Sequence, residues 1–357
     1  MTRACRQHGL SPFVRISRAG RTVGTILCLA ALSTSVCAGA NDEFYRGKTL
    51  TFLIGEAVGG GYDTYSRLFA SHVGRHIPGN PAVVAQNLPG GGGLTAANRL
   101  YVAAPKDGTM IGMIDQGLYL DQVLGKPGIE YDIAKFNWIG RLLRVTGVLV
   151  SWHTSAVRTA EDLKTHELIV SATGGSSRQN WVALNALVGT KLKIIGGYTG
   201  TGHSALALER GEIEGMSFPW VVLKATHQGW LDEHKINVLL QTGLDKDPVL
   251  PQVPRMIDLA PDPDAERILR LFSSPYSIGR SVVAPPGLPQ PTVAALRRAF
   301  DETLADPDFR AAAAKGGLQI DPLPGDRLQE LITGGGALPA PLVERARHII
   351  GAGKPAN

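Results

Sequence analysis

The sequence predicts an α/β protein made of two lobes that face each other across a cleft. Short apolar runs, which are typical of buried strands, alternate with segments whose apolar residues recur at helical spacing. Glycine-rich turns stand directly before helical segments, two of them in each half of the chain. We expect each lobe to be a mainly parallel sheet flanked by helices, with its loops gathered at the carboxyl edge of the strands.

The first unit after the N-terminal region establishes this pattern. Residues 51–54 form a short apolar run that predicts a strand, and a helical segment begins after residues 59–61, which are all glycine. Glycine accepts a positive φ and has no side chain, so the free N–H groups of the first helical turn can contact a ligand directly. Together with the helix dipole they favour a carboxylate or phosphate. Asp63 is expected to be the N-cap of this helix.

The rest of the first half repeats the alternation. Residues 82–86 predict a second strand, and a glycine-rich turn at 87–93 precedes a second helical segment. A Pro-Lys-Asp-Gly turn at 105–108 leads into a third strand at 110–114. Residues 142–151 are a long apolar run, which we expect to be one strand that leaves the first lobe.

The second half uses the same elements. Glycine turns at 173–177 and 198–202 each precede a helical segment. Strands are expected at 167–172, near Met216 and at 236–241. Each half of the chain thus has two glycine turns, each directly before a helix. This is the pattern expected of two lobes that share a cleft.

The C-terminal part is expected to return to the first lobe. Residues 245–263 are rich in Pro and Asp and predict a surface loop or linker, and 276–284 predict a strand. Helices are expected at 292–304, at 327–333 and at about 339–350, the last of them packing on the first lobe. The expected boundaries are 41–146 for lobe 1, with 272–357 returning to it, and 147–271 for lobe 2.

Residues 1–40 have the pattern of a secretory leader. Five arginines precede a mostly apolar stretch at 23–36, and Ala38, Gly39 and Ala40 form an A-x-A cleavage site. The apolar stretch is shorter than the roughly 20 residues of a membrane-spanning helix. We therefore expect export to the periplasm with cleavage after Ala40, and keep an uncleaved anchor as the alternative.

Removal of the leader changes the composition of the chain. All three cysteines (Cys5, Cys28 and Cys37) leave with it, so no disulfide, thiolate nucleophile or cysteine-bound metal is expected. Since five of the 36 basic residues and none of the 31 acidic residues lie in the leader, the mature chain is balanced at 31 of each. The basic balance of the whole chain therefore indicates no nucleic-acid partner. The histidines lack metal-ligand spacing, and no cofactor is expected.

Several ordered motifs resemble one family of proteins, the Bug-type periplasmic solute receptors of tripartite tricarboxylate transporters. The likeness spans essentially all of the mature chain. The matching residues are Leu53-Ile54, Gly59-Gly60-Gly61-Tyr62-Asp63 with Arg67, Gln86-Asn87, Pro89 to Gly93, Pro105 to Thr109, Tyr198-Thr199-Gly200, Gly211 to Glu214, and Ala284 to Pro289.

The resemblance implies a type II periplasmic binding fold whose two lobes close on a small organic acid. It also implies delivery of that acid to the membrane subunits of a tripartite tricarboxylate transporter, by a receptor that we expect to be a monomer. Carried over to this chain, the first contact set is Gly59, Gly60, Gly61, Tyr62 and Asp63. The second contact set is Thr173, Gly174, Gly175, Ser176, Ser177, Tyr198, Thr199, Gly200 and Thr201.

This chain departs from the family at both contact sets. Gly55-Glu56-Ala57 stands where many members have Val-Pro-Phe or Val-Pro-Tyr, and the second-lobe turn has Gly174-Gly175-Ser176-Ser177-Arg178 in place of a Gly-x-Gly-Ser pattern. These differences leave the identity of the ligand open. Arg178 is a candidate counter-ion for a second carboxylate, with a solvated surface position as the alternative. Trp220 is a candidate wall of the cleft or a core residue.

Three other functions remain as alternatives. A sensory receptor that docks on a membrane kinase would use the same two lobes. A nucleotide-dependent enzyme would use the two G-x-G-x-x-A matches at 91–96 and 200–205, but neither lies in the first strand–helix unit. An exported hydrolase would use Ser204, although Leu206 replaces the second glycine of a nucleophile elbow. Our prediction is a receptor without catalytic activity.

Overall fold

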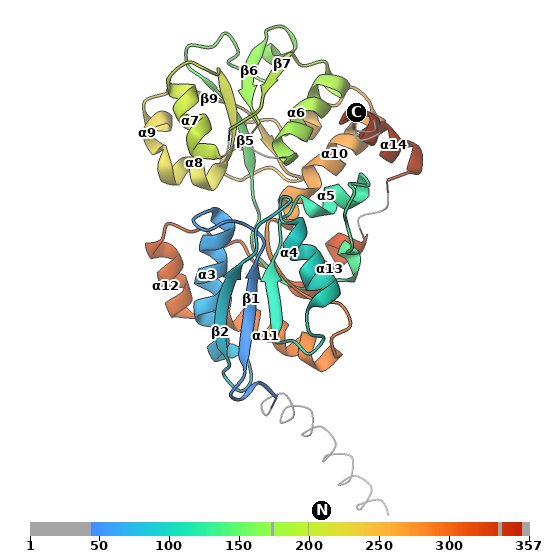
Figure 1. Ribbon diagram of the computed structural model, residues 1–357. Coiled ribbons are helices and arrows are strands. Elements are labelled where there is room, and N and C mark those ends of the chain that lie inside the picture. Colours follow the sequence, from blue (N-terminus) through green and yellow to red (C-terminus); the bar gives the residue numbers. More distant parts are fainter. Residues whose placement is uncertain (1–43, 173–174, 199, 335–337, 352–357) are drawn as a thin grey trace, which may run out of the picture.

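The computed structural model describes residues 44–351, with the exception of 173–174, 199 and 335–337. The proposed leader and the three cysteines lie outside the described residues, as do Thr173, Gly174 and Thr199. None of the described helices is both long enough and apolar enough to cross a bilayer. The chain forms two lobes, each built on one sheet, and they are stacked one above the other in Figure 1.

Lobe 1 contains a sheet of six strands in the order β11-β4-β10-β3-β1-β2. Four strands (β1 to β4) run in one direction, whereas β10 and β11 run in the other. The strands are β1 (Thr49–Ile54), β2 (Ala82–Asn87), β3 (Met110–Met113), β4 (Asn137–Leu143), β10 (Arg280–Ala284) and β11 (Leu323–Pro324).

Lobe 2 contains a sheet of five strands in the order β7-β6-β8-β5-β9. Only β5 runs against the direction of the others. The strands are β5 (Gly147–Trp152), β6 (Leu168–Ser171), β7 (Leu192–Ile195), β8 (Gly215–Pro219) and β9 (Ile236–Thr242). Most strands of each sheet are therefore parallel, which confirms the predicted fold class.

Helices cover both faces of both sheets (Figure 1). The α-helices are α3 (Gly61–Val73), α4 (Leu94–Asn98), α5 (Leu118–Val123), α6 (Gly175–Val188), α7 (Thr201–Glu209), α8 (Trp220–Thr226), α9 (Gln228–Asp232), α10 (Pro263–Ile278), α11 (Gln290–Ala305), α12 (Pro307–Lys315), α13 (Gly325–Gly334) and α14 (Ala340–Ile349). Short 3-10 helices are η2 (Gly74–His76), η4 (Ile133–Lys135), η5 (Glu161–Lys164) and η6 (Met256–Leu259), and η3 (Arg99–Ala103) is a π-helix.

The alternation of side chains along β1 explains how its two faces are covered. Phe52 and Ile54 pack with α3, α11 and α12 in one core cluster, and Leu53 packs with α4 and α13 in another. Successive residues of a strand point to opposite faces, so a continuous apolar run can serve two cores. In lobe 2, Leu149 and Val148 on β5 divide in the same way between two clusters.

The chain passes between the lobes at two places, and both differ from the prediction. Residues 142–151 are not one strand, because β4 ends at Leu143 in one sheet and β5 begins at Gly147 in the other. The return path runs through α10, so Tyr276, which was expected in a strand, lies in this helix. The Val145 N–H donates to the Tyr276 carbonyl at 3.1 Å, which joins the two crossing segments.

The C-terminal region brings two further corrections. The last helix, α14, was expected to pack on lobe 1, but it contacts α6 and α10 and joins a core cluster of lobe 2 through Leu342 and Ala346 (Figure 1). The sequence-based interpretation also missed α12, in which Phe309 is buried against α3. Both helices have a proline in their first turn, which is a common signal for the start of a helix.

Candidate ligand-binding cleft

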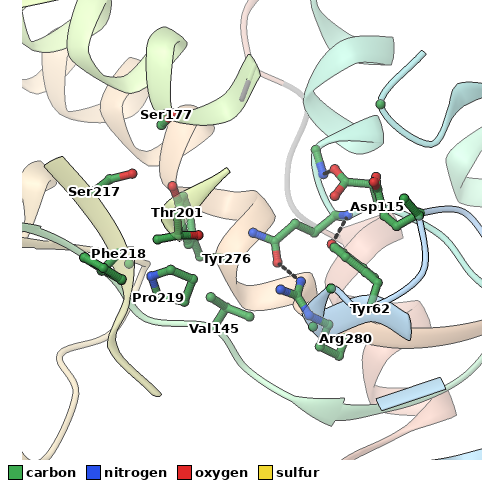
Figure 2. A pocket seen from close by; sticks show the side chains of 18 of the residues that line it. Tyr62, Asp115, Val145, Ser177, Thr201, Ser217, Phe218, Pro219, Tyr276 and Arg280 are labelled. Atoms are coloured by element: carbon green, nitrogen blue, oxygen red, sulfur yellow. Dashed lines mark hydrogen bonds between the residues drawn. The ribbon is translucent and has the colours of Figure 1, made fainter. Parts of the chain in front are cut away.

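A cavity of about 650 Å³ lies between the lobes (Figure 2). Side chains of lobe 1, among them Tyr62, Asp115 and Arg280, stand on one side of it in Figure 2, and Ser217, Phe218 and Pro219 of lobe 2 stand on the other. Residues at the crossing segments lie between them. The lining residues are Glu56, Ala57, Val58, Gly60, Gly61, Tyr62, Gly92, Asp115, Gln116, Gly117, Asp121, Lys126, Val145, Gly147, Ser177, Thr201, Ser217, Phe218, Pro219, Tyr276 and Arg280.

The turn between β1 and α3 forms part of the lobe 1 wall. Gly59 has φ +89°, which a larger residue would adopt only with strain, and Gly60 is the N-cap of α3. Gly60, Gly61 and Tyr62 line the cavity, whereas Gly59 does not. The first N–H groups of a 13-residue helix therefore lie at the cavity wall.

Asp63 has a different position from the one expected. It is the third residue of α3 and not its N-cap, and it does not line the cavity. Its buried carboxylate accepts from the Gly59 N–H at 3.0 Å, from Arg67 Nε at 2.9 Å and from Asn87 Nδ2 at 2.9 Å. Burial by itself raises the pKa of Asp63, but these hydrogen bonds together lower it below its usual value. Asp63 thus stabilises the glycine turn without lining the cavity itself.

Lobe 2 contributes uncharged donors. Helix α7 begins at Thr201 after the N-cap Gly200, and Thr201 lines the cavity together with Ser177 of α6. Ser217 and its two neighbours come from the carboxyl end of β8. Hydroxyl groups and the N-terminus of a helix are suited to an anion or a polar neutral group.

Other residues of the expected contact sets lie away from the cavity lining. Arg178 is exposed on α6, and Tyr198 is half-buried against the core cluster that contains α7 and α8. Trp220 is 8% exposed and belongs to the same cluster, in agreement with its alternative interpretation as a core residue. Gly200 is the N-cap of α7 and is not a lining residue, and Gly175 and Ser176 are the first two residues of α6. Thr173, Gly174 and Thr199 fall outside the described residues.

Arg280 is a lining residue that the sequence-based interpretation missed. Its guanidinium lies 3.7 Å from the centre of the Tyr62 ring, and its Nη1 donates weakly to Gln116 Oε1 at 3.4 Å (Figure 2). A Cβ added to Gly61 would lie 3.6 Å from Arg280 Nη2, so the cation stands directly beside the start of α3. No carboxylate of the described residues is within ion-pair distance of it.

Two acidic lining residues, Glu56 and Asp115, were also missed. Desolvation and the neighbouring Asp115 charge raise the pKa of Glu56 to about 7, and Arg280 opposes that rise. Desolvation also raises the pKa of Asp115, although it accepts from the Gly117 N–H at 2.7 Å and from the Tyr62 hydroxyl. The Tyr62 hydroxyl in turn accepts from the Gln116 N–H at 2.8 Å. Lys126 pairs with Asp121 at 2.7 Å on the same side of the cavity.

The sequence could have indicated Glu56 and Asp115 as lining residues, but it could not have indicated Arg280. Glu56 and Asp115 follow the carboxyl ends of β1 and β3, where open α/β sheets bind their ligands. Arg280 begins β10, and the start of this strand reaches the same edge only because β10 is antiparallel to β3. Strand direction comes from long-range pairing, which local sequence does not encode.

The hydrolase alternative finds no matching geometry among the described residues. Ser204, the candidate hydrolase nucleophile, is fully buried in α7 and does not line the cavity. No group of three or more His, Cys, Asp or Glu within residues 44–351, apart from the segments left out, could hold a metal ion. The cleft contains instead helix starts, hydroxyl groups and a few charges, which are suited to reversible binding.

Residues 70–333 match the family described as the tripartite tricarboxylate transporter family receptor (TctC). No curated protein matches the chain. Among solved structures, a TctC solute-binding protein from Polaromonas without ligand has 18% identity and a TM-score of 0.62, covering 86% of this chain and 99% of that one. MatC from Rhodopseudomonas palustris with bound malate has 22% identity and a TM-score of 0.58, covering 85% and 99%.

A further protein of R. palustris, solved with adipate, has 18% identity and a TM-score of 0.60, covering 85% of this chain and 98% of that one. At these identities the likeness to the solved structures concerns the fold. The family match extends over most of the chain, from α3 to α13. This chain therefore belongs to the receptor family of the tripartite tricarboxylate transporters, as its ordered glycine and proline motifs predicted.

Proposed function

We propose that this protein is a periplasmic receptor that binds a small organic acid between its lobes and delivers it to the membrane subunits of a tripartite tricarboxylate transporter. In this proposal the leader is cleaved after Ala40, and the lobe boundaries are those expected from the sequence, except that α14 belongs with lobe 2. The observation that carries the proposal is the cavity itself, which has a helix start on each side.

The charges and donors of the cleft support an acid as the ligand. On lobe 1, Arg280 and the N–H groups at Gly60 and Gly61 provide a cation and helix-start donors beside each other. On lobe 2, Ser177 and Thr201 provide donors at the starts of α6 and α7. Malate and adipate in two structures of the same fold are both carboxylates, which agrees with this ligand class.

Binding in this proposal is coupled to closure of the lobes. Each exposed helix-dipole contact is worth only about 0.3–1 kcal/mol, so tight binding requires donors from both lobes in a space from which water is excluded. These contacts exist together only when the lobes approach each other, so the ligand favours the closed state. Opening at the membrane partner then removes one half of the contacts and releases the acid.

The substitution Gly60→Val tests the site. Gly60 has extended backbone angles, and an added Cβ would meet only the Ala57 carbonyl, at 3.9 Å, so the variant is expected to fold. Its side chain would cover the start of α3 and block the ligand. Wild-type protein should show a rise in melting temperature with at least one member of an organic-acid panel, and the variant should show none.

A matched control is Gly334→Val at the exposed end of α13, where an added Cβ has no neighbour within 4 Å. This variant should retain the wild-type response. An unchanged response of Gly60→Val, confirmed by calorimetry, would remove the site from the proposal, and the absence of any bound acid in the wild-type protein would remove the function.

A further inference from the structure

We propose that the ligand of this receptor carries an ammonium group beside its carboxylate, which makes it an amino acid or a close analogue. Arg280 would bind the carboxylate, and Glu56 and Asp115 would bind the ammonium group. The inference rests on the proposed function and refines its substrate class. It depends on three ionisable side chains that line one cavity and form no ion pair with one another among the described residues.

The three side chains are near neighbours at the lobe 1 wall. Arg280 acts electrostatically on both Glu56 and Asp115, and the Asp115 charge acts on Glu56. Even so, the ion pairs within 4.0 Å that the described residues form include none of the three. One guanidinium and two carboxyl groups thus line the same cavity, and a ligand that carries both a carboxylate and an ammonium group could contact both kinds of side chain.

The remaining charges at the cleft are already accounted for. Lys126 is paired with Asp121 at 2.7 Å, and Asp63, behind the glycine turn, is paired with Arg67 at 2.9 Å. None of the described lining residues of lobe 2 is ionisable. They are Gly147, Ser177, Thr201, Ser217, Phe218 and Pro219. Among the lining residues that the structure describes, Arg280 is therefore the one cation without an ion-pair partner.

This balance disfavours a dicarboxylate. Its second carboxylate would find no cation among the described lining residues of lobe 2 and would add negative charge near Glu56 and Asp115. Charges that leave water are stabilised only when they are paired and hydrogen-bonded. An ammonium group provides a partner for Glu56 and Asp115, while the adjacent carboxylate provides one for Arg280.

The arrangement also predicts a direction for the pH dependence of binding. Glu56 faces Asp115 and Arg280, with Tyr62, Tyr276 and the Asp121–Lys126 pair as the other ionisable lining groups. Its pKa is about 7 without ligand, so the carboxyl is partly protonated at neutral pH. An ammonium group favours the ionised form, so binding should release a proton and strengthen from about pH 6 to about pH 8. A second carboxylate would take up a proton and bind more weakly over the same range.

The test is isothermal titration calorimetry on the purified exported protein. The probes are the proteinogenic L-amino acids, 4-aminobutyrate, the dicarboxylates from malonate to adipate, and citrate. At least one amino acid should bind at least about tenfold more tightly than the dicarboxylate of equal chain length. Titration in two buffers of different ionisation enthalpy should show proton release at about pH 7.

Three variants identify the residues. Glu56→Gln and Asp115→Asn each remove a charge with little change of volume and should weaken amino-acid binding about tenfold or more. Glu56→Gln should also abolish the proton release. The control Glu161→Gln changes an exposed acid in lobe 2, outside the cavity, and should bind like wild type.

The outcomes separate this inference from the function on which it rests. If dicarboxylates or citrate bind more tightly than every amino acid, the inference is wrong while the acid receptor stands. If an amino acid binds but Glu56→Gln and Asp115→Asn bind it as well as wild type does, the assigned ammonium site is wrong. If no acid of any class binds, the proposed function itself fails.

Discussion

Glu56 stands directly beyond the carboxyl end of β1, where the chain turns toward α3. Its carboxyl is partly buried beside Asp115, and for that reason its pKa rises from 4.5 to about 7. A carboxyl whose pKa is raised by folding stabilises the native state most at low pH, below its unfolded pKa. That contribution is lost as the pH rises through the folded pKa.

The substitution Glu56→Gln should therefore change the pH dependence of stability without ligand. Between about pH 4.5 and about pH 7 the wild type should lose about 1–2 kcal/mol relative to the variant, a value discounted from the full shift because the side chain is partly exposed. Urea unfolding of both proteins across this range measures the difference. If the unfolding free energies of the two proteins change with pH in parallel, folding does not raise the pKa of Glu56.

At the scale of the element, the glycine turn and α3 are joined into one unit by hydrogen bonds to Asp63, which does not line the cavity. Asp63 accepts hydrogen bonds from the turn, from Arg67 on the next helical turn and from Asn87 at the end of β2. Arg67 Nη2 also donates to Asn87 Oδ1 at 2.6 Å. This network connects the helix, the turn and the neighbouring strand, and it keeps the first N–H groups of α3 directed at the cavity.

Asp63→Ala should accordingly weaken ligand binding although Asp63 does not line the cavity. Loss of these hydrogen bonds should lower the free energy of unfolding by about 2–3 kcal/mol. Since the pKa of Asp63 is lowered in the folded state, its contribution is present above the unfolded pKa and disappears as the pH falls through the folded one. The variant should thus differ most from wild type near neutral pH and least in acid, as measured by thermal unfolding.

At the scale of the whole molecule, two crossing segments connect the lobes and meet at the cavity. Val145 and Gly147 of the first segment line the cavity with Tyr276 of the second. Arg144, in the first segment, pairs with Asp245 of the loop after β9 at 3.2 Å and with Asp321 before β11 at 3.5 Å. A change of angle between the lobes would be absorbed where the chain crosses, between β4 and β5 and near the end of α10, rather than within either sheet.

Ligand binding should make the protein more compact. Small-angle X-ray scattering should record a smaller radius of gyration with saturating ligand than without it, because the contacts of the acid with both lobes favour closure. Gly60→Val should show no change under the same conditions. Tight binding by the wild type with an unaltered scattering curve would exclude closure as the binding mechanism.

The sequence by itself determined the fold class, the glycine turns at the helix starts and the family, because each depends on local patterns of few residues. Side-chain periodicity distinguishes strand from helix, and glycine at residues 59–61 marks a turn that other residues would strain. The sequence showed that Glu56 departs from the family pattern, but it did not show which charged residues lie near Glu56.

Only the tertiary structure decided which side chains surround the ligand space. Arg280 and Asp115 are far apart in sequence and meet because β10 pairs antiparallel with β3, and α14 joins lobe 2 because its apolar face fits α6 and α10. Strand direction, helix docking and the raised pKa of Glu56 all depend on which distant segments pack together. That choice is made by the free energy of the whole core and not by any local pattern.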